Sequence, residues 1–548
     1  MSKISGGEAL VQSIIRHGVD TIFGLPGVQT YAVFDALARH EDQIRGFYTR
    51  HEQGAAYMAF GYARSTGKPG VYCVVPGPGV LNSTGALCTA WGCNEPVLCL
   101  TGQVPSAFIG KRRGHLHELP DQLSTMLALT KWAARVDDST LTHEVIDRAF
   151  REMLSGRRGP VSVEMAWDVM ARKVEISDGE APAALKPPLL NPDEITSAVK
   201  MIAEAKNPLI AVGSGALDAA EEVLALAEML EAPVTANRSG RGIVSEYHPL
   251  GVNSVQGFEL WPDVDLVIGI GSRLEVPYLR WAGPKCFAKR PETPRLIRID
   301  IDPDEMTRMA PDAGIVGDSK SAVAALVSQL ETRIDKPVSR RADIAAAKAA
   351  GALTTDSIQP QAGFVRAIRA ALPREGILVD EVCQPGYMAL AAHPIHAPRT
   401  FITSGFQGTL GYGYATALGV KAAHPDKPVV SMNGDGGFMF GMSELATAVQ
   451  HKLGVVAVVF DNHSFLNVRR DQRRLFDGRV VGSDLHSPDF AALAETFGVR
   501  GSVAETPGAL QRQLAERLEA DEPALIQVPI EKDSEISPWG VLMPGLPS

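Results

Sequence analysis

An aspartate and an asparagine in the last third of the chain have the side chains and the spacing of a divalent-metal site. Asp435 stands in the segment NGDGG at positions 433–437, and Asn462 follows 27 residues later, after an apolar run. A carboxylate and a carboxamide suit Mg²⁺, whose remaining ligands would be phosphate oxygens and water. Ser464, two residues beyond Asn462, could add its backbone carbonyl.

The glycines around Asp435 favour a bound diphosphate at this point. A glycine has no Cβ, so backbone N–H groups can approach a phosphate closely at the start of a helix. The glycines concerned are Gly434, Gly436 and Gly437. The alternative is that Gly-Asp-Gly is only a turn, and that residues 461–462 only end a strand.

Neighbouring strands must bring the two metal ligands together. The runs Val429–Met432 and Val455–Phe460 predict strands, and Ser443–Lys452 between them predicts a helix. This order describes one right-handed β–α–β unit with parallel strands. Both ligands then emerge at the carboxyl edge of the sheet, where open α/β sheets bind ligands.

Strands and helices alternate in three stretches, which predicts an α/β protein with three doubly wound parallel-sheet domains. A length of 548 residues exceeds one ordinary core and agrees with three domains. We expect an N-terminal domain at residues 1–185, a central domain at 190–335, a linker at 336–360 and a C-terminal domain at 361–548.

Charge, hydropathy and cysteine usage exclude several classes. The net charge is −10 and no basic stripe occurs, which argues against nucleic acid as a partner. No uncharged run of about 18 apolar residues is present, which argues against a membrane span. The six cysteines form no CxxC pair, as expected of free thiols in a reducing compartment. The start MSKISGGEAL does not resemble a signal peptide, so we expect a cytoplasmic protein.

Three segments together resemble the thiamine-diphosphate-dependent enzymes of the acetolactate synthase, benzaldehyde lyase and pyruvate decarboxylase superfamily. Gly-Asp-Gly with an asparagine at this interval is similar to the family's cofactor signature, although Asp461 replaces the first of two asparagines. Residues 405–413, GFQGTLGYG, look like the loop before a helix in acetolactate synthases, and residues 50–56, RHEQGAA, resemble the segment with the activating glutamate. The resemblance implies pyrimidine-binding, central and diphosphate-binding domains, with thiamine diphosphate and Mg²⁺ as cofactors.

The same resemblance implies roles for residues around the cofactor. Glu52 would hydrogen-bond the aminopyrimidine ring, in a dry site that favours the protonated carboxyl group. The alternative is that a glutamate at a helix start only complements the helix dipole. Leu410 would lie beneath the bent cofactor, the carbonyl of Gly408 would accept a hydrogen bond from it, and Gln384 would join the cofactor-binding residues.

Substrate selection is expected from residues that differ within the superfamily. Gln29 stands where benzaldehyde lyase has a catalytic histidine, and Gln103 is shared with acetolactate synthases. Residues 110–121, GKRRGHLHELPD, add His115 and His117, either of which could move protons near neutral pH. The alternative is that each histidine faces solvent or tethers the loop.

The implied reaction forms or breaks a carbon–carbon bond in 2-oxo acids, 2-hydroxyketones or aldehydes, as an acetolactate-synthase-like carboligase does. A 2-oxo acid decarboxylase or a benzaldehyde-lyase-like lyase is the alternative, and an acyl-CoA lyase or decarboxylase is a further one. Residues 467–472 replace the segment in which acetolactate synthases carry a selectivity-setting tryptophan, so these alternatives stay open. Arg469 and Arg470 in that segment either bind an acidic or CoA-type group or belong to a solvated helix face.

Assembly and a second cofactor also follow from the resemblance. In this family the site forms between the first domain of one subunit and the third domain of another. Since Glu52 and Asp435 belong to those two domains, we expect a homodimer or homotetramer. The central domain resembles one that binds FAD in acetolactate synthases and ADP in oxalyl-CoA decarboxylases, with Arg273 as a candidate contact.

Two other classes of protein compete with this interpretation. A nicotinamide-dependent dehydrogenase should carry GxGxxG at a helix start, and the GSG at residues 213–215 lacks the third glycine. A non-catalytic regulator that kept the fold should have lost Glu52 or Asp435, and both are present.

Overall fold

The computed structural model describes residues 3–176, 186–281, 290–333 and 338–544. Within them the chain forms three six-stranded sheets, and every neighbouring pair of strands in these sheets is parallel. The predicted α/β fold of three doubly wound parallel sheets is confirmed. The expected domain ends at residues 185 and 335 lie outside the described residues.

Each sheet keeps its strands in one stretch of the chain. The first sheet has the order β3 (Arg45–Tyr48), β2 (Thr21–Gly24), β4 (Gly70–Val74), β5 (Val97–Gln103), β7 (Val161–Ala166) and β6 (Trp132–Val136). The central sheet has the order β11 (Gly251–Val252), β10 (Val234–Ala236), β9 (Pro208–Val212), β12 (Leu266–Ile270), β13 (Arg295–Asp300) and β14 (Ala313–Val316). The third sheet has the order β16 (Phe401–Ile402), β15 (Ile377–Val379), β17 (Val429–Gly434), β18 (Val455–Asp461), β20 (Ala524–Pro529) and β19 (Arg500–Val503).

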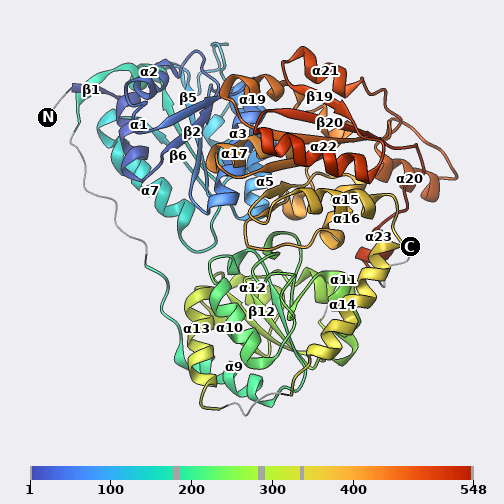
Figure 1. Cartoon of the computed structure of the whole chain (residues 1–548). Coiled ribbons are helices and arrows are strands. Elements are labelled where there is room, and N and C mark those ends of the chain that lie inside the picture. Colours follow the sequence, from blue (N-terminus) through green and yellow to red (C-terminus); the bar gives the residue numbers. More distant parts are fainter. Residues whose placement is uncertain (1–2, 177–185, 282–289, 334–337, 545–548) are drawn as a thin grey trace.

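The first and third domains lie side by side, and the central domain lies below both in Figure 1. Helix α3 (Glu52–Thr66) of the first domain packs against α17 (Gly413–Ala423) of the third. A Cβ added at Gly61 would lie 2.2 Å from the Thr416 carbonyl oxygen, so only glycine permits this approach. Because residues 54–65 are all buried, α3 is enclosed on every side.

The predicted linker contains a helix. Helix α14 (Arg341–Asp356) packs against α11 (Ser254–Leu260) of the central domain, and the chain continues from it into the third domain. Figure 1 shows α14 running along the edge of the central domain towards that third domain.

Strands β17 and β18 lead directly into the predicted metal ligands. They are adjacent and parallel, and Gly434 stands opposite Phe460 in their register. Both strands are buried over their whole length, as expected for a parallel sheet covered by helices on both faces. β17 ends directly before Asp435, and β18 ends directly before Asn462, so the predicted β–α–β unit delivers both residues to one edge.

Candidate active site at the edge of the third sheet

Asp435 begins the short helix α18 (Asp435–Phe438) and is 3% exposed. Its carboxylate accepts a hydrogen bond of 2.8 Å from the Ser487 hydroxyl. Burial, together with the nearby negative charge of Asp461, raises the pKa of Asp435 to about 6. A divalent cation at this carboxylate would relieve both effects, which is why the position fits a metal ligand.

Asn462 is a buried residue whose carboxamide has partners at both ends. Its Oδ1 accepts hydrogen bonds from the Ser464 backbone N–H at 3.1 Å and from the Ser464 hydroxyl at 2.9 Å. Its Nδ2 donates to the Glu535 carboxylate at 2.6 Å. These bonds fix which end of the amide carries the oxygen, the atom that would bind a metal. Ser464 therefore contacts Asn462 through its backbone N–H and its hydroxyl, and the predicted binding of its carbonyl to a metal stays a prediction.

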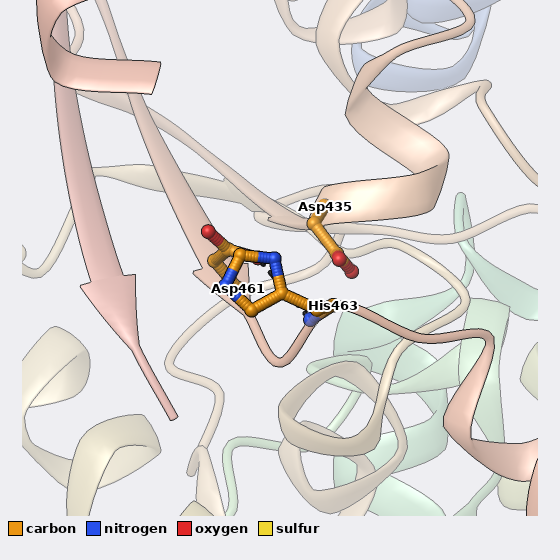
Figure 2. A group of neighbouring side chains, drawn as sticks. All are labelled: Asp435, Asp461 and His463. Carbon is orange, nitrogen blue, oxygen red and sulfur yellow. Dashed lines mark hydrogen bonds and ion pairs between the residues drawn. The ribbon is translucent and has the colours of Figure 1, made fainter. Parts of the chain in front are cut away.

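Sequence reasoning did not foresee a second group of possible ligands. Ligand atoms of Asp435, Asp461 and His463 all lie within 4.8 Å of one another. Figure 2 shows Asp435 at the start of its helix, Asp461 at the end of a strand and His463 in the following loop. Asp461 is buried and accepts a hydrogen bond of 2.9 Å from Gln527, whereas His463 is exposed. The replacement of an asparagine by Asp461 therefore adds a carboxylate beside the predicted metal ligand.

The glycines around Asp435 are closely packed. An added Cβ would lie 2.3 Å from the Phe465 ring at Gly436, 3.2 Å from Leu410 and Glu381 at Gly437, and 3.0 Å from Cys383 at Gly434. Any side chain would therefore both crowd these neighbours and cover the backbone N–H groups. The glycines serve packing as well as any approach of a phosphate.

Gln384 is a buried residue with one polar atom unpaired, as expected of a side chain that binds a ligand. It begins helix α16 (Gln384–Ala392), is 4% exposed, and has no hydrogen-bond partner for its Oε1. A buried polar atom without a partner is uncommon and calls for an explanation. A cofactor at the start of α16, where Cys383 lies against Gly434, would supply one.

The loop before α17 brings Leu410 to the glycine motif. Leu410 and Gly437 are neighbours, and Gly408 adopts the left-handed conformation with a φ of +56°. The Glu381 carboxylate anchors the loop by accepting hydrogen bonds from the backbone N–H groups of Gly411, at 3.2 Å, and Gly413, at 3.0 Å. Burial raises the pKa of Glu381 to about 7. Sequence reasoning missed this anchor because no local pattern marks it.

Glu52 does not serve to cap its own helix. The backbone N–H groups of Arg50 and His51, just before α3, donate to the Glu444 carboxylate of the third domain at 3.1 and 3.0 Å. The half-buried Glu52 instead accepts a hydrogen bond of 3.0 Å from Asn82. A Cβ added at Gly79 would lie 3.3 Å from its Oε1. The cap of α3 is His51, whose Nδ1 accepts a hydrogen bond of 3.1 Å from the Gln53 backbone N–H, and Glu52 in the first turn complements the helix dipole as well.

Gln29 and His117, nominated separately from the sequence, form a pair. Their Oε1 and Nδ1 atoms are 2.8 Å apart, and the Gln29 amide donates through Nε2 to the Leu116 carbonyl at 2.8 Å. Because that bond fixes Gln29 Oε1 as the acceptor, His117 carries its proton on Nδ1 and leaves a lone pair on Nε2. Both residues have a positive φ, of 72° and 66°.

The other two nominated side chains, Gln103 and His115, make different contacts. Gln103 is buried, accepts a hydrogen bond from the Val104 backbone N–H at 2.8 Å and donates to Glu164 at 3.4 Å. The His115 ring lies 4.0 Å from the Phe108 ring, centroid to centroid. The structure therefore joins Gln29 to His117 and engages Gln103 in the core of the first domain.

The arginines of helix α20 (Leu466–Leu475) are engaged with neighbouring residues. Arg469 forms an ion pair with Asp484 at 2.8 Å and another with Asp533. Arg470 donates to Asn467 at 2.8 Å and also to Ser537. These contacts favour a structural role over recognition of a CoA-type group.

The central domain has a cavity of about 450 Å³, a size common for small-molecule sites. Gly215 and Gly271 in its lining belong to turns that follow β9 and β12, and a Cβ added at Gly215 would lie 2.8 Å from the Cα of Gly271. The Arg273 guanidinium lies 4.0 Å from the centroid of the Phe406 ring. Residues of all three domains line the cavity, including Arg64 of the first, Arg273 of the central and Phe406 of the third.

Fold and site together define a class of α/β enzyme that binds a phosphorylated cofactor at the carboxyl edge of a parallel sheet. Three family models match in chain order: the N-terminal TPP binding domain of thiamine pyrophosphate enzymes at residues 4–125, their central domain at 195–326, and their C-terminal TPP binding domain at 383–528. The chain belongs to the family of thiamine pyrophosphate enzymes. It is therefore a thiamine-diphosphate-dependent enzyme and not a nicotinamide-dependent dehydrogenase.

Relatives with assigned names match almost the whole chain. A probable acetolactate synthase large subunit of Methanococcus aeolicus is 32% identical over 97% of this chain and 93% of its own length. An acetolactate synthase of Arthrospira platensis is 32% identical over 98% of this chain and 96% of its own. A probable 2-ketoarginine decarboxylase of Pseudomonas aeruginosa is 34% identical over 90% of this chain and 88% of its own. Among the described residues, no helix is long and apolar enough to cross a membrane.

Proposed function

We propose that this protein is a thiamine-diphosphate-dependent carboligase of the acetolactate synthase type, acting on 2-oxo acids or 2-hydroxyketones. Asp435, Asn462 and the Ser464 carbonyl would hold Mg²⁺, and Gly434, Gly436, Gly437 and Gln384 would line the diphosphate. The main support is that Asp435, a buried carboxylate with a raised pKa, directly follows β17, the strand beside the one that delivers Asn462. When bound, thiamine diphosphate supplies a nucleophilic carbon and an electron sink for the bond that breaks beside a carbonyl.

The chain's own residues would position and protonate the reactants. Leu410 would lie beneath the cofactor, and the Gly408 carbonyl would accept a hydrogen bond from its amino group. Glu52 would hold a proton towards the aminopyrimidine ring. His117, whose Nε2 is left as an acceptor by its bond to Gln29, would accept or return a proton at the substrate. His115 and Gln103 would act less directly, because other contacts hold them.

Decarboxylation without ligation is the second candidate. His117 would be available to protonate the reacting carbon, and a relative named as a probable decarboxylase is 34% identical to this chain. Product analysis separates the two. Pyruvate, benzoylformate, oxalyl-CoA and benzoin should each be supplied with and without an acceptor aldehyde. Ligated products that need the acceptor support the carboligase, and aldehyde alone in every mixture would contradict it.

Replacement of His117 by alanine should lower the ratio of protonated to ligated product, because a proton source beside the substrate is lost. The ratio is measured by chromatography of the product mixture from one donor and one acceptor. Lys111→Ala, which removes an exposed side chain of the same loop, is the control and should leave the ratio near that of the parent enzyme. An unchanged ratio in His117→Ala would mean that His117 only tethers the loop.

We also propose a homodimer or homotetramer in the cytoplasm, with Glu52 of one subunit completing the site of another. The buried thiols Cys73, Cys93 and Cys99 agree with a reducing compartment.

If the central domain binds FAD or ADP, its cavity with Arg273 would hold that nucleotide, and the proposed reaction requires neither. The domain limits 1–185, 190–335 and 361–548 remain part of this proposal.

Co-expression of two inactive variants tests the shared site. A mixed dimer of Glu52→Gln and Asp435→Ala subunits should contain one site with both intact residues, if each site takes these residues from different subunits. Partial activity should therefore return in the mixture, measured after purification through a different tag on each subunit. No recovery in mixed dimers would mean that both residues serve the same site from one chain.

A further inference from the structure

The C-terminal segment, residues 531–542, contacts helix α20 and Asn462 of the candidate metal site. Asp533 pairs with Arg469 of α20, and the Trp539 indole N–H donates to Asn467 of the same helix at 2.7 Å. The Ile536 carbonyl accepts a hydrogen bond of 2.7 Å from Gln361. The segment is thus attached to the third domain at several points.

One side chain of this segment reaches the metal site itself. The Glu535 carboxylate lies 2.6 Å from Nδ2 of Asn462, although 73 residues separate the two in the chain. Glu535 is half-buried, whereas the residues before it, 531–534, are exposed. A carboxylate that accepts from an amide N–H₂ group makes a short, charge-assisted hydrogen bond.

The direction of this bond matters for the metal. An asparagine amide can turn end over end, and only its oxygen can bind Mg²⁺. With Nδ2 engaged by Glu535, the oxygen end is held on the opposite side, where Ser464 also contacts it. Residues that orient a metal ligand in this way typically change metal affinity when they are replaced.

We propose that Glu535 is a positioning residue that fixes the carboxamide of Asn462 for the metal and thereby couples the C-terminal segment to cofactor binding. The inference rests on the proposed metal site. The competing outcome is that Glu535, as a further negative charge near Asp435, repels the diphosphate. The two roles predict opposite effects of removing Glu535. Cofactor and metal binding weakens if Glu535 positions Asn462, and it strengthens if Glu535 repels the diphosphate.

The test is a Mg²⁺ titration of the full-length protein at a fixed concentration of thiamine diphosphate, followed by calorimetry. Glu535→Ala should raise the Mg²⁺ concentration needed for half-saturation by about tenfold or more. Glu535→Gln should largely restore binding, because its amide oxygen can accept the same hydrogen bond. Glu531→Ala, which removes an exposed glutamate of the same segment, is the matched control and should behave as the parent protein.

Each outcome has a distinct meaning. Unchanged or tighter binding in Glu535→Ala, while the parent protein binds, overturns the role of Glu535 alone. Absence of binding in the parent protein overturns the metal site and this inference together. If Glu535→Ala fails to fold, judged by its cofactor-free thermal unfolding, Glu535→Asp replaces it. That shorter side chain keeps the charge and should show the same loss.

Discussion

Glu52→Gln should reduce turnover by about 100- to 10,000-fold, the range typical of losing a proton-transferring group. Thiamine diphosphate and Mg²⁺ should still bind, because glutamine has nearly the same shape and can keep the bond to Asn82. The start of α3 is capped by His51, whose Nδ1 accepts from the Gln53 backbone N–H, and the substitution leaves this cap intact. Turnover is measured by product formation at saturating cofactor, and binding by calorimetry.

A matched control is available in the same domain. Glu41→Gln changes an exposed glutamate and should leave turnover unaltered. Near-normal turnover in Glu52→Gln would remove the assigned role of Glu52. Weakened cofactor binding with an unchanged unfolding temperature would instead show that Glu52 contributes to cofactor binding.

Asp435→Ala should abolish Mg²⁺-dependent retention of thiamine diphosphate. Losing a direct ligand should cost at least as much as the roughly 10- to 100-fold loss of affinity seen for groups that only orient a ligand. Retention is measured by titration with and without Mg²⁺, and by the cofactor left on the protein after gel filtration. Unaltered binding would contradict the metal assignment and would point to Asp461 and His463 as the ligands.

Asp435→Asn is the control for folding. Burial raises the pKa of Asp435 to about 6, so its ionised form destabilises the cofactor-free fold at neutral pH. A neutral amide avoids that cost and can still accept from Ser487. The cofactor-free variant should therefore unfold at a higher temperature than the parent protein while binding cofactor poorly. Lower stability would mean that the carboxylate has a structural role.

Much of the third domain could be predicted because its signals are local. The apolar runs that became β17 and β18 and the glycines around Asp435 lie within one β–α–β unit, where spacing alone brings Asp435 and Asn462 to the same edge. The α3–α17 junction was not predictable in this way. It depends on the contact of Gly61 with a carbonyl from a distant part of the chain, and nothing in the local sequence indicates that contact.

In the candidate site, too, the sequence indicated single residues but not the contacts that folding creates between distant ones. Gln29 and His117 were both nominated, but their mutual hydrogen bond joins two loops 88 residues apart and appears only in three dimensions. Gln103 was nominated from a family match, yet its environment is a buried polar network with Glu164. Glu381 and Glu535 carry no motif, because each acts through backbone or amide groups that folding brings to it.

Titration of the purified full-length chain with thiamine diphosphate, with Mg²⁺ present and then removed by a chelator, tests the central claim most directly. We predict saturable uptake of one cofactor per chain in Mg²⁺ and its release when the metal is removed. The proposed site would be contradicted by a sample that takes up no thiamine diphosphate in the presence of Mg²⁺, although a thermal unfolding transition shows that it is folded.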